Sequence, residues 1–97
     1  MIIEQSSRFE EEFEIIIDFI ALDSANRALE FYDEIKIKIK NIPHSPYSYR
    51  KRNNTESSTT RELIFKGYTI PFEIDEKNNK IIILGIFNQN LWNEQEN

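Results

Sequence analysis

Residues 61–92 read RELIFKGYTIPFEIDEKNNKIIILGIFNQNLW, and this stretch decides the fold. In its first half, apolar side chains occupy every second position: Tyr68, Ile70, Phe72 and Ile74. Because side chains in a strand point alternately to opposite faces, this spacing predicts a strand with one apolar face. The polar segment 76–80 includes two Asn residues, which tolerate the left-handed backbone of tight turns. We therefore predict a β-hairpin that turns at this segment.

The second arm of this hairpin, residues 81–87, reads IIILGIF and has no polar face. Such a composition is typical of a strand covered on both faces, so the residues before the hairpin must supply the cover. Pro71 lies within the first arm and removes a backbone donor. It is therefore expected at a sheet edge, at a β-bulge or facing a partner.

Composition limits the possible classes of protein. The 97 residues suit one domain spanning 1–97, and the chain has no Cys and a single histidine, His44. We therefore expect no disulfide, no metal site and no cofactor. No apolar run approaches about 18 residues and no basic segment precedes a long apolar core, so we expect a cytoplasmic protein without membrane contact.

Charge is strongly segregated along the chain, although the total is only -5. Residues 1–34 hold two basic and ten acidic residues, residues 35–68 hold eight and two, and residues 69–97 hold two and five. An acidic total disfavours general nucleic-acid binding, because phosphate affinity comes mainly from accumulated cationic contacts. The basic middle section can still hold one anionic partner.

The first helix is predicted from a cap and an apolar stripe. Ile2 and Ile3 indicate a short opening strand, after which Ser6 or Ser7 caps a helix. An apolar stripe then recurs at helical spacing: Phe9, Phe13, Ile16, Ile17 and Ile20. Ile15 and Phe19 fall off this stripe, either as ordinary exposed residues or as part of a partner surface.

A second helix is predicted from Ser24 as its cap to Pro43, which closes it. Segment 34–40 reads EIKIKIK and alternates as a strand would. We favour a helix, because the apolar stripe begun at Ala25 continues to Ile42 without slipping and no turn signal interrupts it. Two helices joined by a tight corner form a pair that covers the sheet.

Residues 43–60 are predicted to form a surface connector. Within it, segment 47–52 reads YSYRKR and is the densest basic and aromatic cluster in the chain. It is either a solvated loop whose tyrosines pack on the sheet or an anion-binding strip, because Arg matches the geometry of phosphate and carboxylate oxygens.

The order strand, helix, helix and three strands resembles the RelE/ParE superfamily of toxins from type II toxin–antitoxin systems. The segments that carry the resemblance are SANRA at 24–28 with Phe31 and Ile35, PYSYRK at 46–51, REL at 61–63, GYTIPFEID at 67–75 and ILGIFNQN at 83–90. The resemblance implies an α+β fold of order βααβββ, in which a helical hairpin packs on a small antiparallel sheet.

One branch of this superfamily cleaves messenger RNA in the ribosome, which requires a proton acceptor, cations and an acid near the phosphate. Members of that branch often carry an Arg just after the Gly-Tyr element and basic or tyrosyl groups at the end of the last strand. This chain has Thr69 at the first position and Asn-Gln-Asn at 88–90. The resemblance therefore implies no enzyme of the usual kind. The alternative is a ribosome-dependent endoribonuclease with Arg61, Lys66 and Tyr68 as its catalytic residues.

The ParE branch poisons DNA gyrase through protein contacts, and the resemblance is closer to this branch. It implies a toxin that binds a target such as DNA gyrase, is neutralised by a cognate antitoxin and assembles into higher-order complexes with it. A decayed toxin kept as an interaction module is a further alternative. The candidate antitoxin- or target-binding residues are Tyr49, Arg50, Lys51, Arg52, Arg61, Lys66, Asn88 and Asn90.

Overall fold

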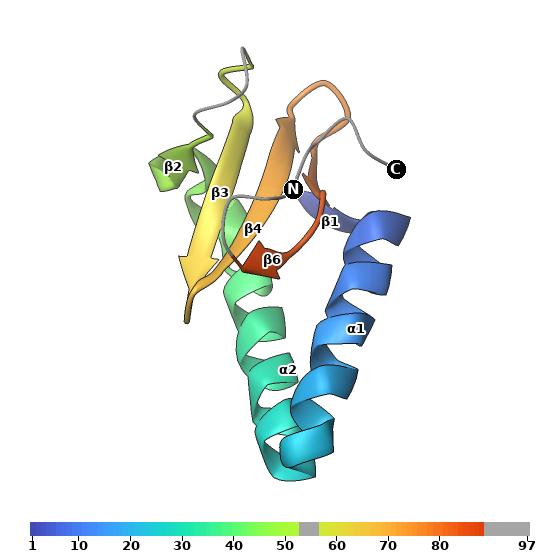
Figure 1. Cartoon of the computed structure of the whole chain (residues 1–97). Helices are drawn as coiled ribbons and strands as arrows, with labels where there is room; N and C mark the ends of the chain where they lie inside the picture. The colour runs from blue at the N-terminus through green and yellow to red at the C-terminus, as the bar shows by residue number, and fades with distance from the viewer. Residues whose placement is uncertain (53–56, 89–97) are drawn as a thin grey trace.

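The computed structural model describes residues 1–52 and 57–88 of the chain. Two helices stand side by side and reach beyond one end of a twisted sheet (Figure 1). The elements are β1 (Ile2–Gln5), α1 (Ser7–Asp23), α2 (Ala25–Lys40), the 3-10 turns η1 (Ile42–His44) and η2 (Pro46–Ser48), β2 (Arg50–Lys51), β3 (Thr60–Phe65), β4 (Tyr68–Asp75), β5 (Lys80–Ile83) and β6 (Phe87–Asn88).

Serine side chains cap both helices, as the sequence predicts. Ser6 is the N-cap of α1, and its side chain accepts a hydrogen bond from the Phe9 N–H at 3.0 Å. Ser24 caps α2 and accepts from the Arg27 N–H at 3.2 Å. Each bond satisfies a backbone donor that the helix itself leaves without a partner. The segment 34–40 is helical up to Lys40, so the helix interpretation of its alternating pattern is confirmed.

The sheet runs in the order β1-β5-β4-β3-β2, and β6 pairs with β4. The pairs β2–β3, β3–β4 and β4–β5 are antiparallel as expected, but β1 lies parallel to β5. The α+β class is confirmed, whereas the sheet is mixed and not purely antiparallel. A parallel pair requires a long crossover between its strands, and here the two helices and the strands β2, β3 and β4 lie between β1 and β5 in the chain.

A break interrupts the second arm of the predicted hairpin. β5 ends at Ile83, paired with Phe72, and β6 resumes at Phe87, paired with Thr69. Between these two pairs, β4 advances by three residues and the second arm by four. One extra residue on one strand of an antiparallel pair defines a β-bulge. The continuous strand predicted over 81–87 is wrong in this respect, although the hairpin is correct.

Pro71 explains the position of this bulge. Its carbonyl accepts from the Leu84 N–H at 2.9 Å. The N–H and C=O of one residue in an antiparallel pair point toward the same neighbouring strand, so the donor that Pro71 lacks would also face segment 84–86. Of the three positions expected for Pro71, the structure thus shows the one beside a bulge.

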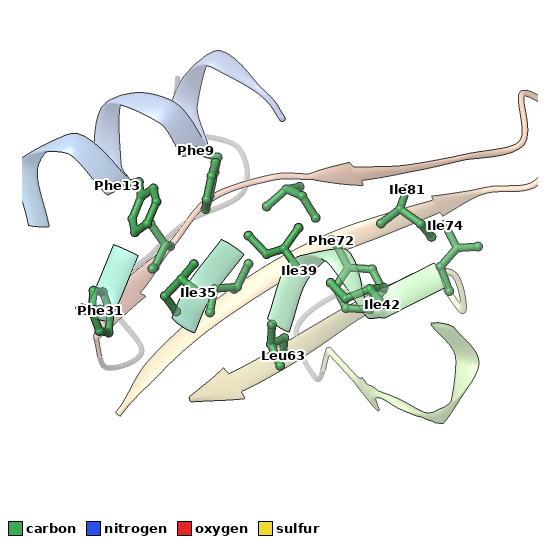
Figure 2. Packing of buried hydrophobic residues seen from close by; sticks show 13 residues of the cluster. Phe9, Phe13, Phe31, Ile35, Ile39, Ile42, Leu63, Phe72, Ile74 and Ile81 are labelled. Atoms are coloured by element: carbon green, nitrogen blue, oxygen red, sulfur yellow. The ribbon is translucent and has the colours of Figure 1, made fainter. Parts of the chain in front are cut away.

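The core lies between the helices and one face of the sheet (Figure 2). Alternate residues of β4 are fully buried there, as the alternation predicts, and Tyr68 packs against the edge of the cluster. In β5, Ile81 and Ile83 are buried while Ile82 is only half-buried, so this strand is fully covered on one face and not on both. Burial of such side chains supplies the main driving force for folding.

Among residues 1–52 and 57–88, neither helix combines the length and the apolar character needed to span a membrane.

Candidate protein interface

Arg50, Arg52 and Glu62 form an ion cluster on the face of the sheet away from the helices. Arg50 Nη2 lies 2.5 Å from Glu62 Oε1, and Arg52 Nη1 lies 2.9 Å from Glu62 Oε2. The side chains of Glu62 and Arg52 are 5% and 9% exposed, whereas Arg50 is 63% exposed. Two of the cations predicted to bind a partner therefore share a buried carboxylate inside the fold.

Arg61 holds the connector against β3. Its guanidinium donates to the carbonyl oxygens of Tyr47 at 3.1 Å, Tyr49 at 3.2 Å and Ser58 at 2.9 Å, and it lies 5.2 Å from the centre of the Tyr47 ring. Tyr49 meets Phe72 edge to face at 5.4 Å, so its ring packs on the core. These contacts support the prediction that the connector's tyrosines pack on the sheet, and they give Arg61 a structural role.

Lys66 and Tyr68 lie at the other end of the β3–β4 hairpin. Lys66 Nζ pairs with Glu34 at 2.8 Å, and the Tyr68 ring lies 5.1 Å from that of Phe31. Arg61 pairs with Phe72 in the register, four positions along β4 from Tyr68, which corresponds to roughly 13 Å. The structure thus does not bring the alternative catalytic trio Arg61, Lys66 and Tyr68 together.

A shallow apolar groove of about 350 Å³ runs between α1 and β6. Ile15 and Phe19, the residues off the core stripe of α1, are 68% and 71% exposed. The lining residues are Glu12, Ile15, Ile16, Phe19, Tyr68, Ile86, Phe87 and Asn88. We name this surface the α1–β6 groove. It contains two residues proposed from the sequence, Tyr68 and Asn88.

Leu22 extends this apolar surface and was not proposed from the sequence. It is 86% exposed and lines a second hollow with Phe19, Ile20, Asp23 and Arg27. Positions 15, 19 and 22 follow helical spacing, so they form a second, solvent-facing stripe on α1. That spacing was the available signal. Contiguous exposed apolar side chains of this kind typically mark a binding surface.

Comparison with known proteins identifies the family of the chain. A family model described as ParE toxin of type II toxin-antitoxin system, parDE, matches residues 3–90. The chain belongs to the ParE toxin family. A solved chain described as the chromosomal ParDE TA system from P. aeruginosa is similar to it, with a TM-score of 0.74 and 19% identity over 93% of this chain and 97% of that one. At this identity the likeness shows the fold alone. Comparison with curated proteins gives no match.

In this ParE-family chain, Tyr47 in the 3-10 turn η2 and Asp75 at the end of β4 have shifted pKa values. A hydrogen bond from the Tyr47 hydroxyl to Glu76 Oε2, at 2.8 Å, raises the pKa of Tyr47. The side-chain and backbone N–H groups of Asn78 donate to Asp75 at 2.9 and 3.1 Å and lower the pKa of that carboxyl. Both effects stabilise the loops at one end of the sheet, because they favour the protonation state that makes the bond.

The remaining proposed residues of this ParE-family chain are more scattered. Lys51 is exposed on the short strand β2, and Asn90 lies outside the described residues. Within residues 1–52 and 57–88, no three His, Asp or Glu side chains come close enough together to hold a metal ion. The α1–β6 groove, by contrast, is lined mainly by apolar side chains, of which Ile15 and Phe19 are exposed.

Proposed function

We propose that this ParE-family toxin acts by binding another protein, such as DNA gyrase, and that a cognate antitoxin neutralises it. The observation that carries this proposal is the α1–β6 groove, whose walls expose large apolar side chains to solvent. An amphipathic segment of a partner fits such a groove by laying apolar anchors along it.

The arrangement of the cations supports binding over catalysis. Cleavage of RNA requires charged groups and a proton-transferring group that converge on one phosphate. Arg61 and Lys66 instead lie near opposite ends of β3, each engaged with other residues of the fold. The groove has one acidic residue, Glu12, whose carboxylate accepts from the Ile86 N–H at 3.0 Å.

The test compares two activities of the purified full chain. We expect inhibition of gyrase supercoiling, relieved by the cognate antitoxin, and no cleavage of messenger RNA on ribosomes. Phe19→Ser should raise the concentration for half-inhibition by roughly 10-fold, because aromatic anchors often dominate an interface. Leu29→Ser is the matched control, since Leu29 is also exposed on a helix, at 64%, and does not line the groove.

Two outcomes would count against the proposal. Ribosome-dependent RNA cleavage that is lost in Arg61→Ala or Tyr68→Phe would identify an endoribonuclease. Absence of growth arrest on expression without the antitoxin would identify a decayed toxin kept as an interaction module.

A further inference from the structure

The outer stripe of α1, which consists of Ile15, Phe19 and Leu22, is open to a partner. The three side chains are 68%, 71% and 86% exposed. The C-terminal half of α1 reaches beyond the end of the sheet (Figure 1), so a partner can lie along it without displacing a strand. Seven residue steps separate Ile15 from Leu22, which corresponds to about 10 Å along the helix axis. The stripe therefore offers two turns of apolar side chains.

Acidic side chains flank one side of this stripe. Glu12 and Ile16 lie on the side that faces β6, where both line the α1–β6 groove. On a helical wheel, Glu11 and Asp18 lie on the opposite side of the stripe. Glu11 and Asp18 are exposed, and neither forms an ion pair with another residue among 1–52 and 57–88. These two carboxylates therefore give this side of the stripe a negative charge.

The charge of α1 as a whole is negative too. Residues 7–23 contain one basic residue, Arg8, and six acidic residues. Arg8 pairs with Glu12 at 3.2 Å. Arg27 of α2 borders the hollow at the end of the stripe and pairs with Asp23 at 3.7 Å. These two cations are thus engaged by other acids, and an approaching partner meets a negative surface.

This negative surface selects among partners. A second copy that packed its α1 on this one would oppose its own acids, and an acidic protein segment or a nucleic acid would be repelled. A cationic partner would be attracted. An α-helix suits the shape of the stripe, because its own apolar ridge packs along side chains at positions i, i+4 and i+7 while flanking charges set its orientation.

We propose that the outer stripe of α1 binds an amphipathic helix of the target that carries Lys or Arg beside its apolar face. The apolar side chains of that helix cover Phe19 and Leu22, and its cations lie near Glu11 and Asp18. Apolar contact supplies affinity, and the charges select the partner and its orientation. The inference rests on the proposed function for the existence of a target, and it specifies the chemistry of that partner.

The experiment measures binding of two synthetic peptides to the purified full chain by fluorescence anisotropy. Each peptide has about 18 residues, which is long enough for partial helix formation in water. Both peptides share one leucine stripe, which is flanked by Lys in the first and by Glu in the second. The Lys peptide should bind at least roughly 10-fold more tightly than the Glu peptide. Phe19→Ser should weaken Lys-peptide binding by roughly 10-fold, and Glu11→Gln combined with Asp18→Asn should weaken it by roughly 5-fold.

The matched control is Glu30→Gln combined with Asp33→Asn on α2. It removes the same number of negative charges from exposed positions, and neither residue lines the α1–β6 groove or the hollow beside Leu22. Any loss of binding caused by net charge alone would therefore appear in this control as well. We expect its dissociation constant for the Lys peptide to stay within about 2-fold of that of the unmodified chain.

The outcomes separate this inference from the proposed function. Equal binding of the two peptides, or a control variant that binds as weakly as Glu11→Gln with Asp18→Asn, overturns the inference, while inhibition of gyrase supercoiling still upholds the proposed function. Tighter binding of the Glu peptide overturns it and assigns the stripe to an acidic segment. Self-association of the chain that Phe19→Ser abolishes overturns it too and assigns the stripe to a second copy. Lys-peptide binding with the expected losses, but without inhibition of gyrase, upholds the inference and removes gyrase as the target.

Discussion

Replacement of Glu62 by Ala tests whether the basic connector is structural. The buried carboxylate of Glu62 pairs with two guanidinium groups, those of Arg50 and Arg52. The Arg52 side chain is buried as well, at only 9% exposed. Removal of one partner from a buried ion pair leaves the other charge in a poorly solvated site and costs about 3–5 kcal/mol. The total stability of a domain of this size is only about 5–15 kcal/mol. We therefore expect Glu62→Ala to remove a large part of it.

The measurement is urea unfolding followed by circular dichroism at neutral pH, together with thermal unfolding. Glu62→Ala should lower the free energy of unfolding by at least about 3 kcal/mol, which corresponds to a fall in Tm of about 12–24 °C for this chain length. Arg50→Ala is the control on the same carboxylate. Its side chain is 63% exposed, and exposed pairs contribute about 0.2–1 kcal/mol.

A double-mutant cycle completes this test. Arg52→Met and Glu62→Ala should be coupled by about 0.5–3 kcal/mol, because the two side chains are in direct contact. If Glu62→Ala costs no more than Arg50→Ala, or if the cycle shows no coupling, the cluster is not a structural element. Its arginines would then be available to a partner, and the basic connector would belong to the binding surface.

Two further predictions concern the core and the β4–β5 turn. Ile35→Ala should lower the free energy of unfolding by about 2–5 kcal/mol, because Ile35 is fully buried. Ile37 is 60% exposed, so Ile37→Ala should change the free energy of unfolding by less than about 0.5 kcal/mol in the same urea experiment. Asn78→Ala should raise the pKa of Asp75 toward its ordinary value in an NMR titration. Because folding lowers this pKa, the hydrogen bonds from Asn78 stabilise the folded chain at pH values above the ordinary pKa of Asp75. That stabilisation is lost as the pH falls through the lowered pKa of the folded chain. An unchanged Asp75 titration would contradict that cause.

Most of the fold was predictable because helical stripes and strand alternation give distinct burial patterns. Segment 34–40 was ambiguous, since isoleucines occur there at every second position. In the structure Ile35 and Ile39 are buried while Ile37 is exposed. The buried isoleucines are thus four residues apart, which is helical spacing. In the sequence this spacing becomes visible only when the apolar stripe is followed back to Ala25. The direction of β1 was not predictable, because local sequence does not specify which strand becomes its neighbour.

The candidate site was harder to predict than the fold. The sequence reveals where cations occur, but not which of them another residue of the chain neutralises. Arg50 and Glu62 lie twelve positions apart and meet because β2 pairs with β3 in one register. Conversely, the sequence places Lys36 and Lys40 in the last turns of a helix, where cations are favourable, and gives no other sign that they belong to a surface site. Both line a shallow groove beside β1, and that position depends on the packing of α2 against β1.

The α1–β6 groove depends on a local exception in the sheet. Pro71 withholds a donor from the second arm of the hairpin, and a bulge follows at residues 84–86. At the end of the bulge, Ile86 donates its N–H to Glu12 on α1, and Phe87 then resumes pairing with Thr69 on β4. If the bulge lacked its extra residue, the segment after it would shift by one position along β4. The side chains of residues 86 and 87 would then point to the opposite faces of the sheet. Pro71 therefore favours the bulge, and the bulge in turn places the apolar side chains of segment 86–87 opposite α1. The departure from regular sheet geometry thus shapes the surface that we propose binds the target.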